Sequence, residues 1–167
     1  MLKERLPRGI RNNNPLNIRR GKTKWVGETI MGDIPDRIFC QFEAMKYGWR
    51  AAFLLIKKYI NVYKCNTIEK IINKWAPPNE NKTNHYIIFV AMQCGIEAGR
   101  PFDFNDPVIL RIGAAMCMME NGEKYNPYGE KNKKLLEAMQ WGKAYASASA
   151  QFKNYKSTEQ TNELWQP

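Results

Sequence analysis

The sequence predicts a mainly α (α+β) fold with a small β-hairpin. Apolar residues recur at helical spacing in several separate stretches, whereas one short stretch early in the chain alternates instead. A length of 167 residues with 44% hydrophobic content suffices for one core but not comfortably for two. We expect one domain over residues 1–146 and a polar C-terminal tail over 147–167, where Ser, Gln, Asn, Thr and Lys dominate.

The N-terminal part is expected to form a loop and a hairpin. Three consecutive asparagines, Asn12 to Asn14, bond readily to nearby backbone and tolerate unusual dihedrals, so they predict a tight, ordered loop before Asn17 and Ile18. From Trp25 to Phe42, alternating apolar residues between glycines and a proline predict two short strands.

Helices account for most of the remaining chain. Each is expected from helical spacing of apolar residues between capping and stop signals. They are predicted over Tyr47–Tyr63, from a cap at Asn66 or Thr67 to Lys74, over Asn84–Cys94 after a cap around Thr83, from a cap at Asp106 to a stop at Gly122, and from Asn132 to about Ala146.

Two of these helices carry predictions about packing. In the first, Trp49, Phe53, Ile56 and Ile60 form the inward stripe, while Lys57, Lys58 and Asn61 are expected to face solvent. In the last, the residues expected to pack on the body are Leu135, Leu136, Met139 and Tyr145.

Composition narrows the partners and the compartment. A net charge of +10 indicates a polyanionic partner, with nucleic acid, anionic membrane and bacterial cell wall as candidates. No apolar run is long enough to span a membrane, and the N-terminus lacks a secretory signal, so synthesis in the cytoplasm is expected. The cysteines lack CxxC spacing and are expected to be buried thiols: Cys40, Cys65, Cys94 and Cys117.

Glu120 is the candidate for chemistry. It is the last acidic side chain before the Gly122 stop, on a helix that is otherwise apolar after Asp106. Beside Met118 and Met119 its carboxyl would be partly desolvated, which raises the pKa and allows proton donation near neutral pH. A general acid for glycoside cleavage needs that property. On the pattern alone, a solvated glutamate at a helix end remains the alternative.

Four segments resemble one family. RGIRNNNPLNI followed by Trp25 and Gly27, FCQFEAMKYGWRAAFLLIKKY, TIEKIINKWAPPNENKTNHYIIFV and MMENGEKYNPYG together cover Arg8 to Gly129. They are similar to motifs of a lysozyme-like, peptidoglycan-cleaving family found in phage virion proteins and bacterial cell-wall hydrolase domains. Leu16 departs from the pattern, since the family usually has Gly there.

The resemblance implies a lysozyme-like helical domain in which Glu120 is the catalytic acid/base. Substrate-binding residues are expected in the asparagine loop and around the helix ends: Asn13, Asn14, Asn17, Trp75, Glu80, Asn81, Tyr86 and Tyr125. In ordinary lytic transglycosylases the catalytic Glu precedes the sugar-binding loop. Here the loop comes first, so we hypothesise a circularly permuted order, which requires Glu120 to lie near the Asn12–Asn17 loop.

The chemistry depends on a second carboxylate. With none facing Glu120, the 6-hydroxyl of the muramic sugar would attack and give an anhydro product, whereas an opposed acid would favour hydrolysis. The candidates for that second acid are Glu28, Asp33, Asp36, Glu43 and, as a further catalytic or substrate-orienting group, Glu80.

Cofactor chemistry finds no support in the sequence. His85 is the one histidine, which argues against a multi-histidine zinc site, and no phosphate-binding glycine loop is present, so we expect no metal and no cofactor.

The predicted function is a glycosidase, either a lysozyme-type hydrolase or a lytic transglycosylase, with peptidoglycan as its partner. It would be a bacteriolytic enzyme of cell wall degradation, delivered to the cell wall and periplasm by a phage or secretion machinery. A monomer is assumed, with no membrane span and no nucleic acid partner expected. The alternative is a non-catalytic phage or secretion-apparatus structural protein that grips cell wall. A nucleic-acid-binding protein is a third interpretation, which rests on charge alone.

Overall fold

The computed structural model describes residues 5–32, 35–79 and 82–152. It is mainly helical with a two-stranded antiparallel sheet, which confirms the predicted class. The elements are α1 (Arg8–Arg11), β1 (Glu28–Thr29), β2 (Gln41–Phe42), α2 (Met45–Asn61), α3 (Ile68–Trp75), α4 (Thr83–Cys94), α5 (Val108–Asn121), the 3₁₀ turn η1 (Glu123–Tyr125) and α6 (Lys133–Ala148).

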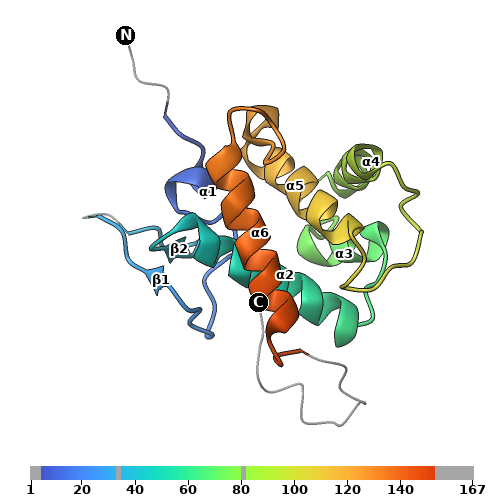
Figure 1. Cartoon of the computed structure of the whole chain (residues 1–167), viewed down its shortest axis with the longest axis horizontal. Coiled ribbons are helices and arrows are strands. Elements are labelled where there is room, and N and C mark those ends of the chain that lie inside the picture. Colours follow the sequence, from blue (N-terminus) through green and yellow to red (C-terminus); the bar gives the residue numbers. More distant parts are fainter. Residues whose placement is uncertain (1–4, 33–34, 80–81, 153–167) are drawn as a thin grey trace.

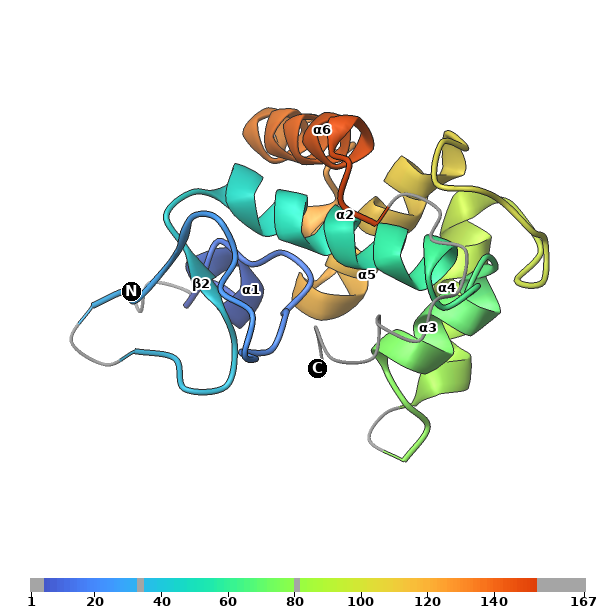
Figure 2. The ribbon, with the colours of Figure 1, turned by 90° about the horizontal axis from the view of Figure 1, so that it is seen from below.

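The helices pack in layers around α2. Figures 1 and 2 show α6 lying along one side of α2, with α5 on the other side and α3 and α4 gathered beyond it, while α1 and the small sheet lie at the opposite end of the molecule. The core is formed mainly by α2, α3 and α5, whose largest fully buried side chains include Trp49, Phe53, Ile72 and Ile112.

The small sheet is extended by loop pairing. Glu28 pairs with Phe42 and Thr29 with Gln41, and a further bridge joins Arg19 to Phe39. The segment that follows the asparagine loop therefore runs beside the strand that leads into α2. This pairing confirms the expected β element, although its regular strands are only two residues long.

Capping explains most helix boundaries. The Thr67 hydroxyl accepts a hydrogen bond from the Lys70 N–H, and the Asp106 carboxylate accepts one from the Val108 N–H, as predicted. Thr83 does not have the expected capping position: α4 begins at Thr83 itself, and its hydroxyl donates to the Ala76 carbonyl at 2.6 Å.

The prediction that Lys57 and Lys58 face solvent was wrong, since each is only 4% exposed. The Lys57 ammonium donates to the carbonyls of Ala146 and Ser149 at 2.8 and 2.7 Å, so it satisfies the C-terminal end of α6. Met139 is fully buried as expected, and Tyr145, although 43% exposed, packs on α2, with the Arg50 guanidinium 4.2 Å from the centre of its ring.

The predicted tail begins inside α6, which extends to Ala148, and residues 153–167 lie outside the described part of the chain. The described helices include none that is both long and apolar enough to cross a bilayer. All four cysteines are free thiols; Cys40, Cys94 and Cys117 are buried as expected, and Cys65 is half-buried.

Candidate functional site

Glu120 lies in the last turn of α5, which ends where Gly122 adopts a positive φ of 101°. Its side chain is half-buried, and the two residues that bond to it come from distant parts of the chain. The Asn17 amide donates to Oε2 at 3.0 Å, and the Tyr86 hydroxyl donates to Oε1 at 3.2 Å. Loop, α4 and α5 therefore converge on one carboxyl group.

Burial raises the pKa of Glu120 above its ordinary value, although the hydrogen bonds from Asn17 and Tyr86 act in the opposite direction. The carbonyl end of the α5 dipole also disfavours a negative charge at this position. The pKa of Tyr86 is raised well above its usual range by its own burial and then by the Glu120 carboxylate. Tyr86 therefore remains a donor, and Glu120 holds its proton at higher pH than an exposed glutamate.

The asparagine loop is built to present Asn17. Asn13 and Asn17 both have φ of 52°, a left-handed conformation that asparagine tolerates better than most residues. The Asn13 amide donates to the Phe42 carbonyl at 2.9 Å. The loop is thus held against the strand β2 while its last asparagine turns towards α5.

Asn14 was predicted to bind substrate, but the structure gives its side chain a structural role. Its side chain is fully buried, and its amide donates to the carbonyls of Ile18 and Cys40, both at 2.9 Å, while its oxygen accepts from the Ile18 N–H. Every one of these bonds is to the backbone of the loop or the adjacent strand. Asn14 therefore fixes the loop and does not face a ligand.

Asn121 and Gly9 also hold the site, and the sequence reasoning assigned no role to either. The Asn121 amide donates to the Pro15 carbonyl at 2.8 Å, which ties the end of α5 to the asparagine loop. Gly9 contacts both this side chain and the loop: a Cβ there would clash with Asn121 Oδ1 and lie 2.8 Å from the Asn14 carbonyl. Asn121 and Gly9 belong to the ENG and RGIRNNN motifs, but a motif does not show which of its residues contact each other across the fold.

Asp36 does not act as a second catalytic acid in this arrangement, because its carboxylate is occupied. It accepts from Arg8 at 2.6 and 2.9 Å, from the Asn12 amide at 2.9 Å, and from the backbone N–H groups of Ile38 and Phe39. Burial alone would raise the pKa of Asp36, but these hydrogen bonds outweigh it and hold the pKa well below its usual range. The group is a permanent anion that pins the loop.

The other candidates for a second acid are likewise placed elsewhere or outside the described residues. Glu28 accepts from the Trp25 N–H at 2.9 Å and pairs with Arg20 at 3.3 Å. Glu43 is exposed. Asp33 and Glu80 lie outside the described residues, and so does Asn81. Among the described residues, the hydrogen-bond partners of Glu120 are Asn17 and Tyr86, and neither is a carboxylate.

Neither Trp75 nor Tyr125 forms a hydrogen bond with Glu120, whose described partners are Asn17 and Tyr86. Trp75 ends α3 half-buried, with its ring 5.9 Å from that of Tyr59 in an edge-on arrangement. Tyr125 is half-buried in η1, directly after the turn at Gly122, and its carbonyl accepts from the Cys117 thiol at 3.6 Å.

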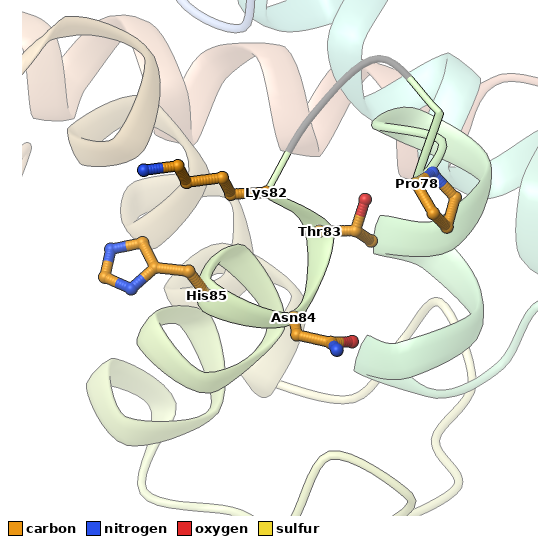
Figure 3. Close-up of a pocket in the computed structure, with 5 residues that line it drawn as sticks. All are labelled: Pro78, Lys82, Thr83, Asn84 and His85. Carbon is orange, nitrogen blue, oxygen red and sulfur yellow. The ribbon is translucent and has the colours of Figure 1, made fainter.

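A pocket of about 240 Å³ lies at the start of α4. The last of its lining residues in the sequence, His85, directly precedes Tyr86. Figure 3 shows Lys82 and His85 projecting to the same side, with Thr83 turned towards Pro78 and Asn84 pointing away from His85. The lining mixes polar and apolar surface and includes one lysine and one histidine. Within the described ranges, no group of three or more His, Cys, Asp or Glu side chains is gathered as metal ligands would be.

The geometry meets the condition set by the permutation hypothesis, since Glu120 and Asn17 are 3.0 Å apart although 103 positions separate them in the sequence. Comparison with known proteins relates the chain to a phage protein. No family model matches the chain. Over 138 residues, 81% of each chain, it is 38% identical to Protein P5 of Pseudoalteromonas phage PM2. The chain therefore belongs to the same family as this phage protein.

Proposed function

We propose that this protein is a lytic enzyme that cleaves the glycan strands of peptidoglycan, with Glu120 as the general acid and then the base. The observation that carries the proposal is a half-buried carboxyl with a raised pKa, held at a helix end by Asn17 and Tyr86. The lysozyme-like motifs supply the substrate class. Similarity to a phage protein agrees with a role in which the enzyme is delivered to the cell wall.

Glu120 would protonate the glycosidic oxygen as the sugar bond breaks. Asn17 and Tyr86 would hold the carboxyl in place and stabilise the anion left behind, because both are donors. Glu120 would then take the proton from the attacking hydroxyl. The same residue thus serves both steps.

The positions of the other described acids favour attack by the 6-hydroxyl of the muramic sugar. Asp36 and Glu28 are paired with arginines, so neither is available as the nucleophile or base opposite Glu120. An intramolecular attack needs no second carboxylate. We therefore expect 1,6-anhydro products, the outcome of a lytic transglycosylase.

The test is incubation with purified peptidoglycan sacculi followed by mass analysis of the released muropeptides. Wild type is compared with Glu120→Gln and with Glu123→Gln, a matched change of an exposed glutamate three residues away. We expect Glu120→Gln to lower release by about 10²-fold or more, and Glu123→Gln to behave as wild type. Anhydro ends would support the transglycosylase, whereas reducing ends would replace it with a hydrolase.

The second candidate is a non-catalytic protein that binds cell wall. One observation favours it: both oxygens of Glu120 already accept hydrogen bonds, as in a carboxylate that only joins segments of a fold. This candidate predicts that wild type and Glu120→Gln sediment equally with sacculi and that neither releases muropeptides. Equal release by both proteins would instead remove Glu120 from the mechanism.

A further inference from the structure

One face of the α2–α6 pair gathers cations and partly exposed aromatic rings. The set, called here the cation–aromatic patch, consists of Lys46, Tyr47 and Arg50 on α2 and Trp141 and Tyr145 on α6. Trp141 and Tyr145 are 39% and 43% exposed. The face belongs to α6 and the start of α2, whereas Glu120 belongs to α5, so the proposed function does not account for it.

In the patch, a cation of α2 faces an aromatic ring of α6 at each of two successive helical turns. Lys46 lies 5.0 Å from the centre of the Trp141 ring, and Arg50, one turn later, lies 4.2 Å from the centre of the Tyr145 ring. Trp141 and Tyr145 stack with their centroids 5.5 Å apart, and Tyr47 meets Trp141 edge-on at 5.9 Å. The two cations are four positions apart in the sequence, and so are the two α6 aromatics, which places each pair on one helix face.

Close contact between the helices creates this alignment. Gly142 lies between the two α6 aromatics in the sequence. A Cβ on it would be 2.7 Å from the backbone nitrogen of Arg50 and 2.7 Å from Trp49 Cβ. The missing side chain lets α6 approach the α2 backbone. The rings of the neighbouring Trp141 and Tyr145 are thereby brought over the α2 cations.

The positive charge of the patch has no carboxylate counter-ion among the residues that the structure describes. Within the described part of the chain, neither Lys46 nor Arg50 forms an ion pair with a carboxylate. Arg50 is only 7% exposed, and its Nε has no hydrogen-bond acceptor. A guanidinium withdrawn from water without a carboxylate is costly, and an anion from outside the chain would offset that cost.

The aromatic rings narrow the class of anion. A sugar or a nucleic-acid base stacks on a bare ring face, but Tyr145 already has Trp141 and Arg50 against it, and Trp141 has Tyr145 and Lys46. Partly exposed Trp and Tyr beside basic residues suit the headgroup region of a bilayer, where their rings are favoured and phosphates meet the cations.

We propose that the cation–aromatic patch docks the protein on a membrane surface rich in anionic phospholipid. The contact is peripheral: ring edges enter the headgroup region and Lys46 meets lipid phosphates, while the buried Arg50 adds its positive charge from behind the Tyr145 ring. It involves no residue assigned to glycan cleavage. Failure of the proposed enzyme activity would leave this docking unaffected, and the reverse is also true.

The test is flotation with vesicles of phosphatidylglycerol and phosphatidylethanolamine, or of phosphatidylcholine alone, in physiological salt. The patch variant is Lys46→Gln with Trp141→Gln, which avoids the buried Arg50. The matched control is Lys133→Gln with Tyr128→Gln, which also removes one charge and one exposed ring. Lys133 lies about two helical turns from Trp141 along α6, and Tyr128 lies in the turn that precedes this helix. Circular dichroism of each variant checks that it is folded.

We expect wild type and control to float with the anionic vesicles and not with phosphatidylcholine, and the patch variant to lose at least about tenfold in partitioning. Brominated lipid should quench the tryptophan fluorescence of wild type more than that of the Trp141→Phe variant. Absence of wild-type flotation, or equal loss in control and patch variant, would overturn the proposal. If the patch variant binds vesicles as wild type does but has lost binding to duplex DNA, the patch would be reassigned to nucleic acid.

Discussion

Glu120 and Asp36 are both partly buried, yet their environments shift their pKa values in opposite directions. Asp36 accepts hydrogen bonds from a guanidinium, an amide and two backbone N–H groups, which hold its charged form. Glu120 accepts one neutral donor on each oxygen, which is too little to offset burial. The difference separates a structural anion from a proton donor.

Tyr86→Phe should make Glu120 a weaker acid. The hydroxyl stabilises the carboxylate, so its loss raises the pKa of Glu120 further, and the alkaline limb of the kcat/KM profile for muropeptide release should move to higher pH. Because the carboxyl is also less well held, release at the optimum should fall roughly tenfold. Tyr128→Phe, at an exposed tyrosine, is the control. An unshifted limb would separate Tyr86 from the titrating group.

Asp36→Asn should destabilise the protein by about 2–3 kcal/mol at neutral pH, because the charged hydrogen bonds to Arg8 and Asn12 are lost together. The pKa of Asp36 is lower in the folded chain than in the unfolded chain. Its stabilisation is therefore present above the ordinary carboxyl pKa and is lost as pH falls towards the folded value. Urea unfolding at pH 7 and pH 3 should show the gap from wild type narrowing in acid.

The control for Asp36→Asn is Glu43→Gln, which changes an exposed carboxylate and should leave the unfolding free energy nearly unchanged. A gap of equal size at both pH values would mean that Asp36 contributes through packing and not through its charge.

At the scale of elements, a glycine in α2 decides how closely the asparagine loop can approach. A Cβ on Gly48 would clash with the Asn13 carbonyl oxygen and lie 2.8 Å from Pro15 Cδ. The loop is already fixed on its other side by Asn14 and Asn121, so it has little room to retreat. The spacing of helix and loop therefore depends on one absent methyl group.

Gly48→Ala should cost about 1–3 kcal/mol of unfolding free energy through overpacking. Because the displaced loop carries Asn17, muropeptide release should fall by a larger factor than the loss of folded protein explains. Gly99→Ala is the control, since a Cβ there meets nothing within 4 Å. Thermal unfolding and activity are measured on the same samples. Full activity in a destabilised Gly48→Ala protein would contradict the positioning role of the loop.

Local signals explain which elements could be predicted from sequence. Helical spacing and caps such as Thr67 and Asp106 act within a few residues, so α2, α3, α5 and α6 agree with expectation to within a few residues. Lys57 failed the prediction because its burial depends on the end of α6, 89 residues away. A lysine that caps a distant helix reads in sequence like any solvated lysine.

The same limit applied to the candidate site. The chemical character of Glu120, an acid at the end of an apolar helix, could be predicted, and burial does raise its pKa. The distinction between Asn14, which is fully buried in the loop, and Asn17, which reaches Glu120, could not be predicted. Both are asparagines of one motif, and only backbone dihedrals and distant partners separate them.

At the scale of the whole molecule, Glu120 joins three parts of the chain: the N-terminal loop through Asn17, α4 through Tyr86, and α5 through its own backbone. A junction of this kind ordinarily stabilises a fold. Whether this junction stabilises or destabilises the fold depends on the protonation of Glu120, because burial disfavours the carboxylate charge and the two donors favour it. The protein is thus expected to sacrifice stability near neutral pH to keep an acid at this junction.

Glu120→Gln should therefore be more stable than wild type at pH 7. The pKa of Glu120 is higher in the folded than in the unfolded chain, so its stabilising contribution is complete below the ordinary carboxyl pKa and is lost as pH rises through the folded value. The difference in unfolding free energy between the two proteins should shrink as pH falls, whereas Glu123→Gln should match wild type throughout. A less stable Glu120→Gln protein at pH 7 would show that Asn17 and Tyr86 bind the carboxylate more strongly than burial penalises it, which would weaken the case for Glu120 as an acid.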